Sequence, residues 1–443
     1  MTSAVLPALT AVRHPRKPRS AERVLESGLR VLAVRKPGVP LVELRLRVPF
    51  LSGRPAHPAR ANVLSDTALA GTAYHDRAGL AAAVQALGGD IGIGVDADRL
   101  MFSGNVLATN LRPLLDLLAS VLNGATYPAN QVEAERARLV EKLTIARSRA
   151  GVVAGEALAH ELYGDHPYAC DLPQPAAAAT VTPAQVRRLH ADLVRPDGAV
   201  LILVGDVTPG RVLDQVEAAL DGWVGSPTRS RVPKLPQIEP KPLLLVDRAG
   251  SVQSSLRMGG PALRRDDARY PALQLANLVF GGYFSSRWNE NIREDKGYTY
   301  GAHSRIEHNV LGSVLTLDAD VATEVSAPAL LETLYELGKI ASLPVTETEV
   351  TSVRQYAIGT LALSTATQGG LASTLAALAG TGLGLDWLLE HPRRLANVGV
   401  DEVSAAAAEF LAPARMVGVV VGDAATIAAP LRAVSDVTVA DPE

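Results

Sequence analysis

The clearest local pattern in the chain is an alternation of apolar and polar residues over positions 41–48. The even positions hold valine or leucine, whereas Glu43, Arg45 and Arg47 occupy odd positions between them. A repeat of two residues is that of a β-strand with one buried face, because successive side chains point to opposite sides of a sheet. Residues 41–48 are therefore predicted to form a half-buried strand.

Similar patterns predict the other elements of the first half of the chain. Groups of strands followed by groups of helices, rather than strict alternation, indicate α+β domains, each with a mostly antiparallel sheet covered by helices. The predicted strands are 29–35, 41–48, 90–95 and 100–106, and the predicted helices are 61–70, 77–87, 111–122 and 130–149.

A longer pattern repeats 217 positions further along the chain. Residues 181–206 align without a gap with residues 398–423, with eight identities that end in Val-Gly-Asp in both copies. Each copy has the pattern of a helix, a turn marked by proline, a buried strand and a Gly-Asp turn. The repeat predicts a tandem duplication, and hence two homologous α+β domains.

The boundaries of the two predicted domains follow from composition. Residues 226–242 contain five prolines among charged residues, which is typical of an extended linker. Residues 1–23 mix prolines with basic residues and are predicted to form a flexible arm. The N-terminal domain is then expected at 24–225 and the C-terminal domain at 243–443.

Charge and cysteine content exclude several classes of protein. The net charge of −3 gives no overall attraction to nucleic acid, and no run of about 18 apolar residues predicts a membrane span. Cys170 is the only cysteine, so an intrachain disulfide is impossible. We therefore expect a cytoplasmic protein with neither nucleic acid nor membrane as a partner.

Several spaced motifs resemble those of the insulinase, pitrilysin and mitochondrial-processing-peptidase family of zinc peptidases. They include LESGLRVLAVRKPGVPLVELRLRV (25–48), LYGDHPYACDLP (162–173) and FGGYFSSRWNENIREDKGYTYGAHS (280–304), and the resemblance extends from about residue 23 to about residue 429. It implies two α+β halves facing each other around a chamber that admits unfolded peptides.

The zinc site of that family is missing from this sequence. The family carries His-x-x-Glu-His on one helix, where two imidazoles bind zinc and the glutamate activates a water molecule. Here the corresponding positions hold Asn62, Ser65 and Asp66, and the more distant glutamate ligand is replaced by Lys142. We therefore expect neither a metal nor another cofactor in this chain. We further expect Asp66 and Lys142 to form an ion pair where the metal would lie.

The second half keeps two residues that the resemblance implies are functional. In the family, an arginine and a tyrosine seven residues apart hold the substrate backbone and stabilise the oxyanion, and they match Arg293 and Tyr300. The alternative is structural, with Arg293 paired to a nearby carboxylate such as Glu290 and Tyr300 packed on a strand. Three weaker candidates in the same block are Arg287, Asn291 and Tyr298.

The resemblance therefore implies a non-catalytic subunit of a heterodimeric zinc metallopeptidase. A homologous partner would supply the zinc, and this chain would present Arg293 and Tyr300 to an unfolded peptide or a precursor with a leader. One alternative is a non-enzymatic structural or peptide-binding protein with the same fold. A peptidase that acts alone would need metal ligands that the sequence does not provide.

Overall fold

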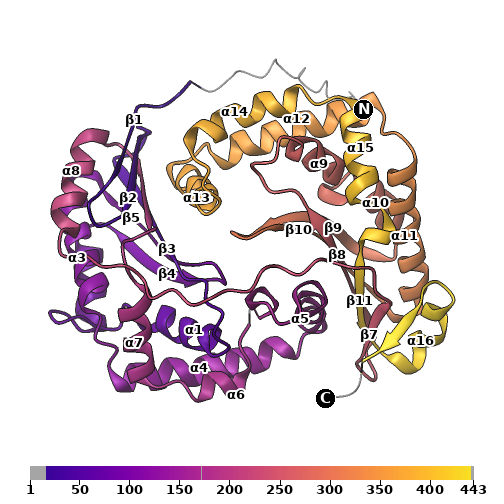
Figure 1. Cartoon of the computed structure of the whole chain (residues 1–443), viewed down its shortest axis with the longest axis horizontal. Coiled ribbons are helices and arrows are strands. Elements are labelled where there is room, and N and C mark those ends of the chain that lie inside the picture. Colours follow the sequence, from indigo (N-terminus) through magenta and orange to yellow (C-terminus); the bar gives the residue numbers. More distant parts are fainter. Residues whose placement is uncertain (1–15, 171, 441–443) are drawn as a thin grey trace, which may run out of the picture.

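The computed structural model describes residues 16–170 and 172–440, which form two halves that lie side by side (Figure 1). Each half contains a six-stranded sheet. The sheet of the first half has the order β1-β2-β6-β3-β5-β4, and that of the second half has the order β12-β7-β11-β8-β10-β9. In both sheets one inner pair is parallel and the next three pairs are antiparallel.

The first half contains most of its helices after the fifth strand. Its strands are β1 (Ser20–Val24), β2 (Arg30–Arg35), β3 (Leu41–Pro49), β4 (Asp90–Val95), β5 (Arg99–Leu107) and β6 (Val200–Gly205). Its helices are α1 (His57–Thr67), α2 (Arg77–Ala86), η1 (Ala108–Asn110), α3 (Leu111–Gly124), α4 (Ala129–Arg147), α5 (Ala150–Tyr163), η2 (Pro167–Ala169), α6 (Pro175–Ala179), α7 (Pro183–Leu193) and α8 (Pro209–Leu220).

The second half repeats this plan. Its strands are β7 (Leu243–Asp247), β8 (Gln253–Ala262), β9 (Thr299–His308), β10 (Ser313–Ala322), β11 (Val417–Gly422) and β12 (Val437–Val439). Its helices are α9 (Tyr270–Asn277), η3 (Leu278–Gly282), α10 (Arg287–Asn289), η4 (Glu290–Asp295), η5 (Thr323–Val325), α11 (Ser326–Ser342), α12 (Glu347–Ser364), α13 (Gln368–Ala379), α14 (Leu385–Ala396), α15 (Val400–Phe410), η6 (Pro413–Arg415) and α16 (Ala424–Arg432).

The repeat found in the sequence is visible in the bounds of these elements. Helices α7 and α15 begin and end 217 residues apart, and so do strands β6 and β11. Both strands are buried along their whole length at the centre of their sheets. The predicted fold class, two tandem homologous α+β domains with mostly antiparallel sheets, is confirmed.

The two halves are joined by a segment without regular structure. No helix or strand is formed between Trp223 and Pro242, and β7 begins at the next residue. At the other end of the first half, Ser20–Val24 pair with β2 as an edge strand, so the flexible arm predicted for residues 1–23 is wrong from Ser20 onward. Residues 1–15 of that predicted arm lie outside the described residues.

Each half covers one face of the other half's sheet with a helix. Helix α13 of the second half packs on β3 and β6, where its Leu371 and Leu375 join a buried cluster with Leu32 and Ile202 of the first sheet. In return, α5 of the first half packs on β8 and β11. Figure 1 shows α13 and α5 between the two sheets. This exchange buries apolar area between the halves and fixes their relative placement.

Candidate functional site

The block around positions 280–300 is anchored by a buried tryptophan. Trp288 is fully buried, its ring stacks on Phe280 with centroids 5.4 Å apart, and its Nε1 donates a hydrogen bond to Thr333 Oγ1 at 3.0 Å. It lies between the π-helical turns η3 and η4, and such turns are frequent at functional sites because they shift the helical register. The segment that carries Arg293 is therefore fixed on a rigid base.

Asn289 ties this segment to the edge strand β9. Its side-chain Nδ2 donates to Ala302 O at 2.7 Å, and its Oδ1 accepts from Ala302 N at 3.1 Å. The residue is buried, so these hydrogen bonds are shielded from water. Its role is not visible in the sequence, because the partner backbone lies 13 residues away in another element.

Arg293 lies on η4 with its guanidinium over an aromatic ring. Its Cζ is 4.3 Å from the centroid of the Phe284 ring, and its Nη1 is 3.3 Å from Glu294 Oε1. The cation–π contact orients the guanidinium without using its hydrogen-bond donors. The side chain is 31% exposed and Phe284 is 62% exposed, so the charged group remains accessible from solvent.

Tyr300 projects from the edge strand β9 with 97% of its surface exposed. Thr299 and Ala302 pair with Val321 and Ala319 of β10, so the strand carries a bulge at Tyr300 and Gly301. A bulge bends the strand and redirects a side chain. Thr299 fastens it, since its Oγ1 donates to Asp320 O at 2.7 Å and accepts from Gly301 N at 3.2 Å.

A tight turn connects the segment that carries Arg293 to the strand that carries Tyr300. Gly297 adopts a φ of +65°, which favours glycine, and Tyr298 N donates to Ile292 O at 2.8 Å. The turn holds both candidates near the start of β9. Among the described residues, no hydrogen bond or ring contact joins the two side chains to each other.

Two of the three weaker candidates already have side-chain partners in the structure. Arg287 forms a bidentate ion pair with Glu349 at 2.7 and 2.9 Å. Asn291 donates to Glu332 at 2.9 Å and to Glu336 at 3.0 Å. The first contact holds α10 against α12, and the second holds η4 against α11. Tyr298 is half-buried at the turn.

The four positions that replace the three metal ligands and the water-activating glutamate lie on α1 and α4, which pack against each other. The Asn62 amide donates to Pro58 O of the preceding turn at 2.9 Å, and Ser65 is buried. Asp66 and Lys142 do not form the predicted ion pair, because no nitrogen–oxygen distance between them is 4.0 Å or less. The prediction of a direct ion pair between Asp66 and Lys142 is therefore wrong.

Asp66 and Lys142 still influence each other through space. Partial desolvation raises the pKa of the Asp66 carboxyl, and the positive charge of Lys142 opposes that shift. Neighbouring Glu135 on α4 instead accepts from Arg77 at 2.6 Å and from Arg138 at 2.8 Å. Glu135, which no sequence motif marks, thus binds the nearby cations. Lys142 remains exposed.

No other metal site replaces the lost one in the part of the chain that the structure describes. Over residues 16–170 and 172–440, no group of three or more histidine, cysteine, aspartate or glutamate side chains is placed to hold a metal ion. In the same residues, no helix is both long and apolar enough to cross a membrane.

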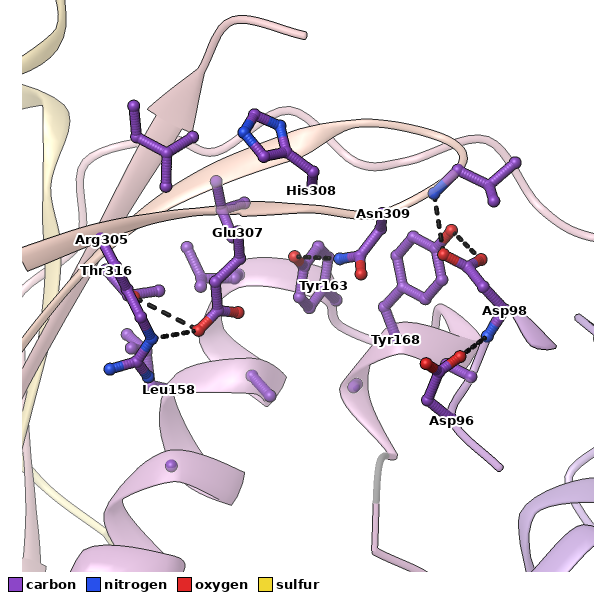
Figure 2. A pocket seen from close by; sticks show the side chains of 18 of the residues that line it. Asp96, Asp98, Leu158, Tyr163, Tyr168, Arg305, Glu307, His308, Asn309 and Thr316 are labelled. Carbon is purple, nitrogen blue, oxygen red and sulfur yellow. Dashed lines mark hydrogen bonds and ion pairs between the residues drawn. The ribbon is translucent and has the colours of Figure 1, made fainter. Parts of the chain in front are cut away.

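A cavity of about 520 Å³ lies between the two halves (Figure 2). Its walls come from both sheets, from α5 and from the end of α13. Figure 2 shows the hairpin of β9 and β10 passing over this cavity toward the first half, with Asn309 facing Tyr163 and Arg305 facing Glu307. No sequence motif pointed to the residues that line this cavity, since residues of both halves are needed to enclose it.

The hairpin tip is fastened to the first half by one carboxylate. Asp98 accepts from the Tyr168 hydroxyl at 2.5 Å and from the Val310 backbone N–H at 2.8 Å, as the dashed lines in Figure 2 show. The Leu311 N–H donates to the same Tyr168 oxygen at 3.2 Å. Burial and the Asp98 charge raise the pKa of the Tyr168 phenol, so the phenol stays protonated and donates.

Comparison with known proteins agrees with this architecture. Residues 180–356 match the family model described as peptidase M16 inactive domain. An uncharacterized zinc protease of Streptomyces coelicolor is 24% identical over 290 residues, which cover 63% of each chain. A probable inactive metalloprotease of Bacillus subtilis is 26% identical over 212 residues, which cover 46% of this chain and 48% of that relative.

Solved structures share the fold over most of their length. The peptidase M16 inactive domain from Pseudomonas fluorescens superposes with a TM-score of 0.85 and 24% identity, covering 91% of this chain and 98% of that one. A protease from Helicobacter pylori gives a TM-score of 0.83 at 16% identity, with 91% and 99% covered. Residues 180–356 are thus similar to an M16 inactive domain and the chain is similar to zinc proteases, which confirms the family resemblance.

Proposed function

We propose that this chain is the non-catalytic subunit of a heterodimeric zinc metallopeptidase. A homologous partner with His-x-x-Glu-His would hold the zinc and its water, and this chain would supply Arg293 and Tyr300 to an unfolded peptide or a leader peptide. The one cysteine requires no oxidising compartment, and we propose that the pair works in the cytoplasm.

The exposure of Tyr300 is the observation that carries this proposal. A tyrosine that is 97% exposed on a bulged edge strand makes no contribution to the core, so packing gives no reason for its position. Its hydroxyl and the accessible Arg293 guanidinium are hydrogen-bond donors, and such donors stabilise negative charge that develops on a carbonyl oxygen. The substitutions at Asn62, Ser65, Asp66 and Lys142 support a zinc that is supplied by a partner.

The edge strand also offers a way to bind peptide backbone. β9 is the last strand of the second sheet, so one of its sides is free of a neighbouring strand. An extended peptide can add to such an edge through main-chain hydrogen bonds, which give affinity with little sequence preference. Tyr300 at the start of β9 would then lie beside the bound backbone.

The first test concerns the chain by itself and with a zinc-bearing homologue. Alone, the purified chain is expected to hold no stoichiometric zinc, measured by elemental analysis, and to cleave no unfolded peptide. Cleavage is expected when the homologue is added. Activity of the chain alone that a chelator abolishes would refute the division of labour, and no gain with any zinc-bearing homologue would favour a non-enzymatic peptide-binding protein.

The second test concerns the two proposed donors. In the assembled pair, Arg293→Ala or Tyr300→Phe is expected to lower kcat by about 10²-fold, the usual cost of one oxyanion donor. Assembly, followed by analytical ultracentrifugation, should be unchanged. Tyr74→Phe is the matched control, since Tyr74 is also highly exposed at 82% but lies in the first half. Unchanged turnover in both variants would refute the assignment.

A further inference from the structure

On the polar face of strand β3, beneath α13, some charged side chains have partners and one does not. Glu43 and Arg45 form an ion pair at 3.0 Å, and the Arg45 Nε also donates to Ser373 Oγ of α13 at 3.1 Å. Arg47, the next residue on that face, is only 6% exposed, and its Nε has no hydrogen-bond partner. The Glu43 carboxylate is thus taken by Arg45, and it forms no ion pair with Arg47.

Arg47 faces the cavity between the two halves. It belongs to the wall of that cavity, and no carboxylate of the described residues lies within 4.0 Å of its nitrogens. A Cβ atom at Gly380, just after α13, would lie 3.0 Å from Nε, so glycine there leaves room for the guanidinium. An arginine remains charged inside proteins, and a buried charge is costly unless it is paired.

Several other charges of the wall are already paired, and Arg265, which also lines the cavity, adds a second positive group. Asp96 pairs with Arg99 at 2.8 Å, Asp318 with Arg257 at 3.3 Å, and Glu307 with Arg305 at 2.8 Å. Asp98 is held by Tyr168 and the hairpin tip. His308 adds no positive charge near neutral pH, since burial and the charge of Arg265 lower its pKa to about 3. The wall therefore offers the positive groups of Arg47 and Arg265, and among the described residues none of its carboxylates lies within 4.0 Å of the Arg47 nitrogens.

The fold itself does not require a charge at this position. Arg47 is paired across the first sheet with Val200. The residue that corresponds to Val200 in the repeat is Val417, which is paired with Gly259 in the second sheet. In the second half a Cβ at Gly259 would lie 2.9 Å from Leu162 of α5, so the equivalent space is closed by an apolar side chain. The unpaired arginine is a feature of one half only, which points to a ligand.

We propose that the cavity is a binding site for a carboxylate, with the Arg47 guanidinium as its anchor. The planar fork of arginine matches a carboxylate in bidentate geometry. Asp96 and Asp98 are close enough for their charge to act on Arg47, and they disfavour a dianion such as phosphate. The apolar wall from Leu158, Leu162 and Val314 suits an aliphatic body, and the volume is within the range of small-ligand sites, about 300–1,000 Å³.

The test uses the full chain alone and does not depend on a zinc partner. Calorimetric titration at constant ionic strength compares tri-alanine with a free carboxyl terminus, its carboxyl-terminal amide, hexanoate and inorganic phosphate. We expect tri-alanine, hexanoate or both to bind, and the amide to bind at least ten-fold more weakly than the free peptide. Binding of the peptide alone identifies a peptide terminus as the source, and binding of hexanoate alone identifies a free organic acid.

Variants connect the binding to Arg47. Arg47→Met is expected to weaken carboxylate binding at least ten-fold, and Arg47→Lys to weaken it less. Arg99→Gln is the control, because Arg99 lines the same cavity but is paired with Asp96. The affinity of this variant for the carboxylate should stay within about three-fold of the wild type. Equal binding of amide and acid, binding of phosphate only, no binding of any probe, or unchanged affinity in a folded Arg47→Met variant would overturn the proposal. The comparison of acid with amide in the wild type needs no variant.

Discussion

Single residues in the second half show how strongly the structure constrains the block around Arg293. Arg287 and Glu349 are the clearest case, since their side chains are 15% and 29% exposed and meet through two hydrogen bonds. Glu349 also accepts from the Thr346 N–H at 2.8 Å in the capping box of α12. One carboxylate thus fixes the start of a helix and the segment before η4.

The ion pair of Glu349 leads to a prediction about pH. Burial would raise the pKa of Glu349, but hydrogen bonds from Arg287 and Thr346 outweigh it and lower the pKa to about 2. The stabilisation is therefore complete above the unfolded value of about 4.5 and is lost as the pH falls toward 2. Glu349→Gln is expected to lower the free energy of unfolding by about 3 kcal/mol near pH 7, and by much less near pH 3.

Urea unfolding at several pH values measures this effect. Glu347→Gln on the same helix is the control, because Glu347 is 71% exposed and reaches Arg354 only at 4.0 Å. Its effect should stay within about 0.5 kcal/mol. An effect of Glu349→Gln that does not depend on pH would show that the ionised carboxylate is not the stabilising group.

At the scale of elements, the exchange of α13 and α5 decides which faces of the sheets are buried. The odd positions of β3 have the polar pattern of a half-buried strand, yet α13 covers them from a distance of more than 300 residues in the chain. Helix α13 makes apolar contacts around Leu371 and Leu375, and polar contacts are found where Glu43 and Arg45 lie. The helix therefore joins the second half to the core of the first.

This exchange predicts that one leucine of α13 stabilises both halves. Leu375 is 1% exposed, so Leu375→Ala is expected to lower the free energy of unfolding by about 3 kcal/mol through lost burial and the cavity left behind. Thermal unfolding followed by circular dichroism should remain a single transition at a lower midpoint. Leu363→Ala on α12, where the side chain is 75% exposed, should change stability by no more than about 0.5 kcal/mol.

Two separate transitions in the wild type would contradict the coupling of the halves. A stable Leu375→Ala variant would show that the packing of α13 on β3 and β6 adds little.

At the scale of the whole molecule, the hairpin of β9 and β10 contacts the first half through its tip. Its tip reaches Asp98 and Tyr168 of the first half, while Gly312 lies against Leu235 of the connecting segment. The same hairpin carries Tyr300 at its other end. The position of the proposed substrate-binding edge relative to the first half therefore depends on this contact.

Loss of the Asp98 carboxylate should free the hairpin tip. Asp98→Asn is expected to speed amide hydrogen exchange at Val310 and Leu311 at least ten-fold, because a hydrogen bond to a charged group contributes about 1.5–3 kcal/mol. Hydrogen exchange with mass spectrometry measures this. Asp320→Asn, at the opposite end of the same hairpin, should leave these two amides unchanged. Equal exchange in Asp98→Asn and the wild type would contradict a role for this carboxylate in closure.

The sequence alone determined the elements, the duplication and the loss of the zinc ligands. Local periodicity gave β4 with its observed bounds, and the 217-residue repeat placed α7, α15, β6 and β11 correctly, because these patterns are set by neighbours in the chain. The substituted positions at 62, 65, 66 and 142 could be identified by spacing from motifs that lie close to them.

Only the tertiary structure decided what covers each face and which charges meet. Periodicity shows that β3 has a polar side, but not that a helix from the other half buries Arg47 there. Opposite charges at Asp66 and Lys142 suggested a pair, whereas the nearby Glu135 takes the cations Arg77 and Arg138. Contacts between residues far apart in sequence depend on how the two halves pack, and no local pattern encodes that packing.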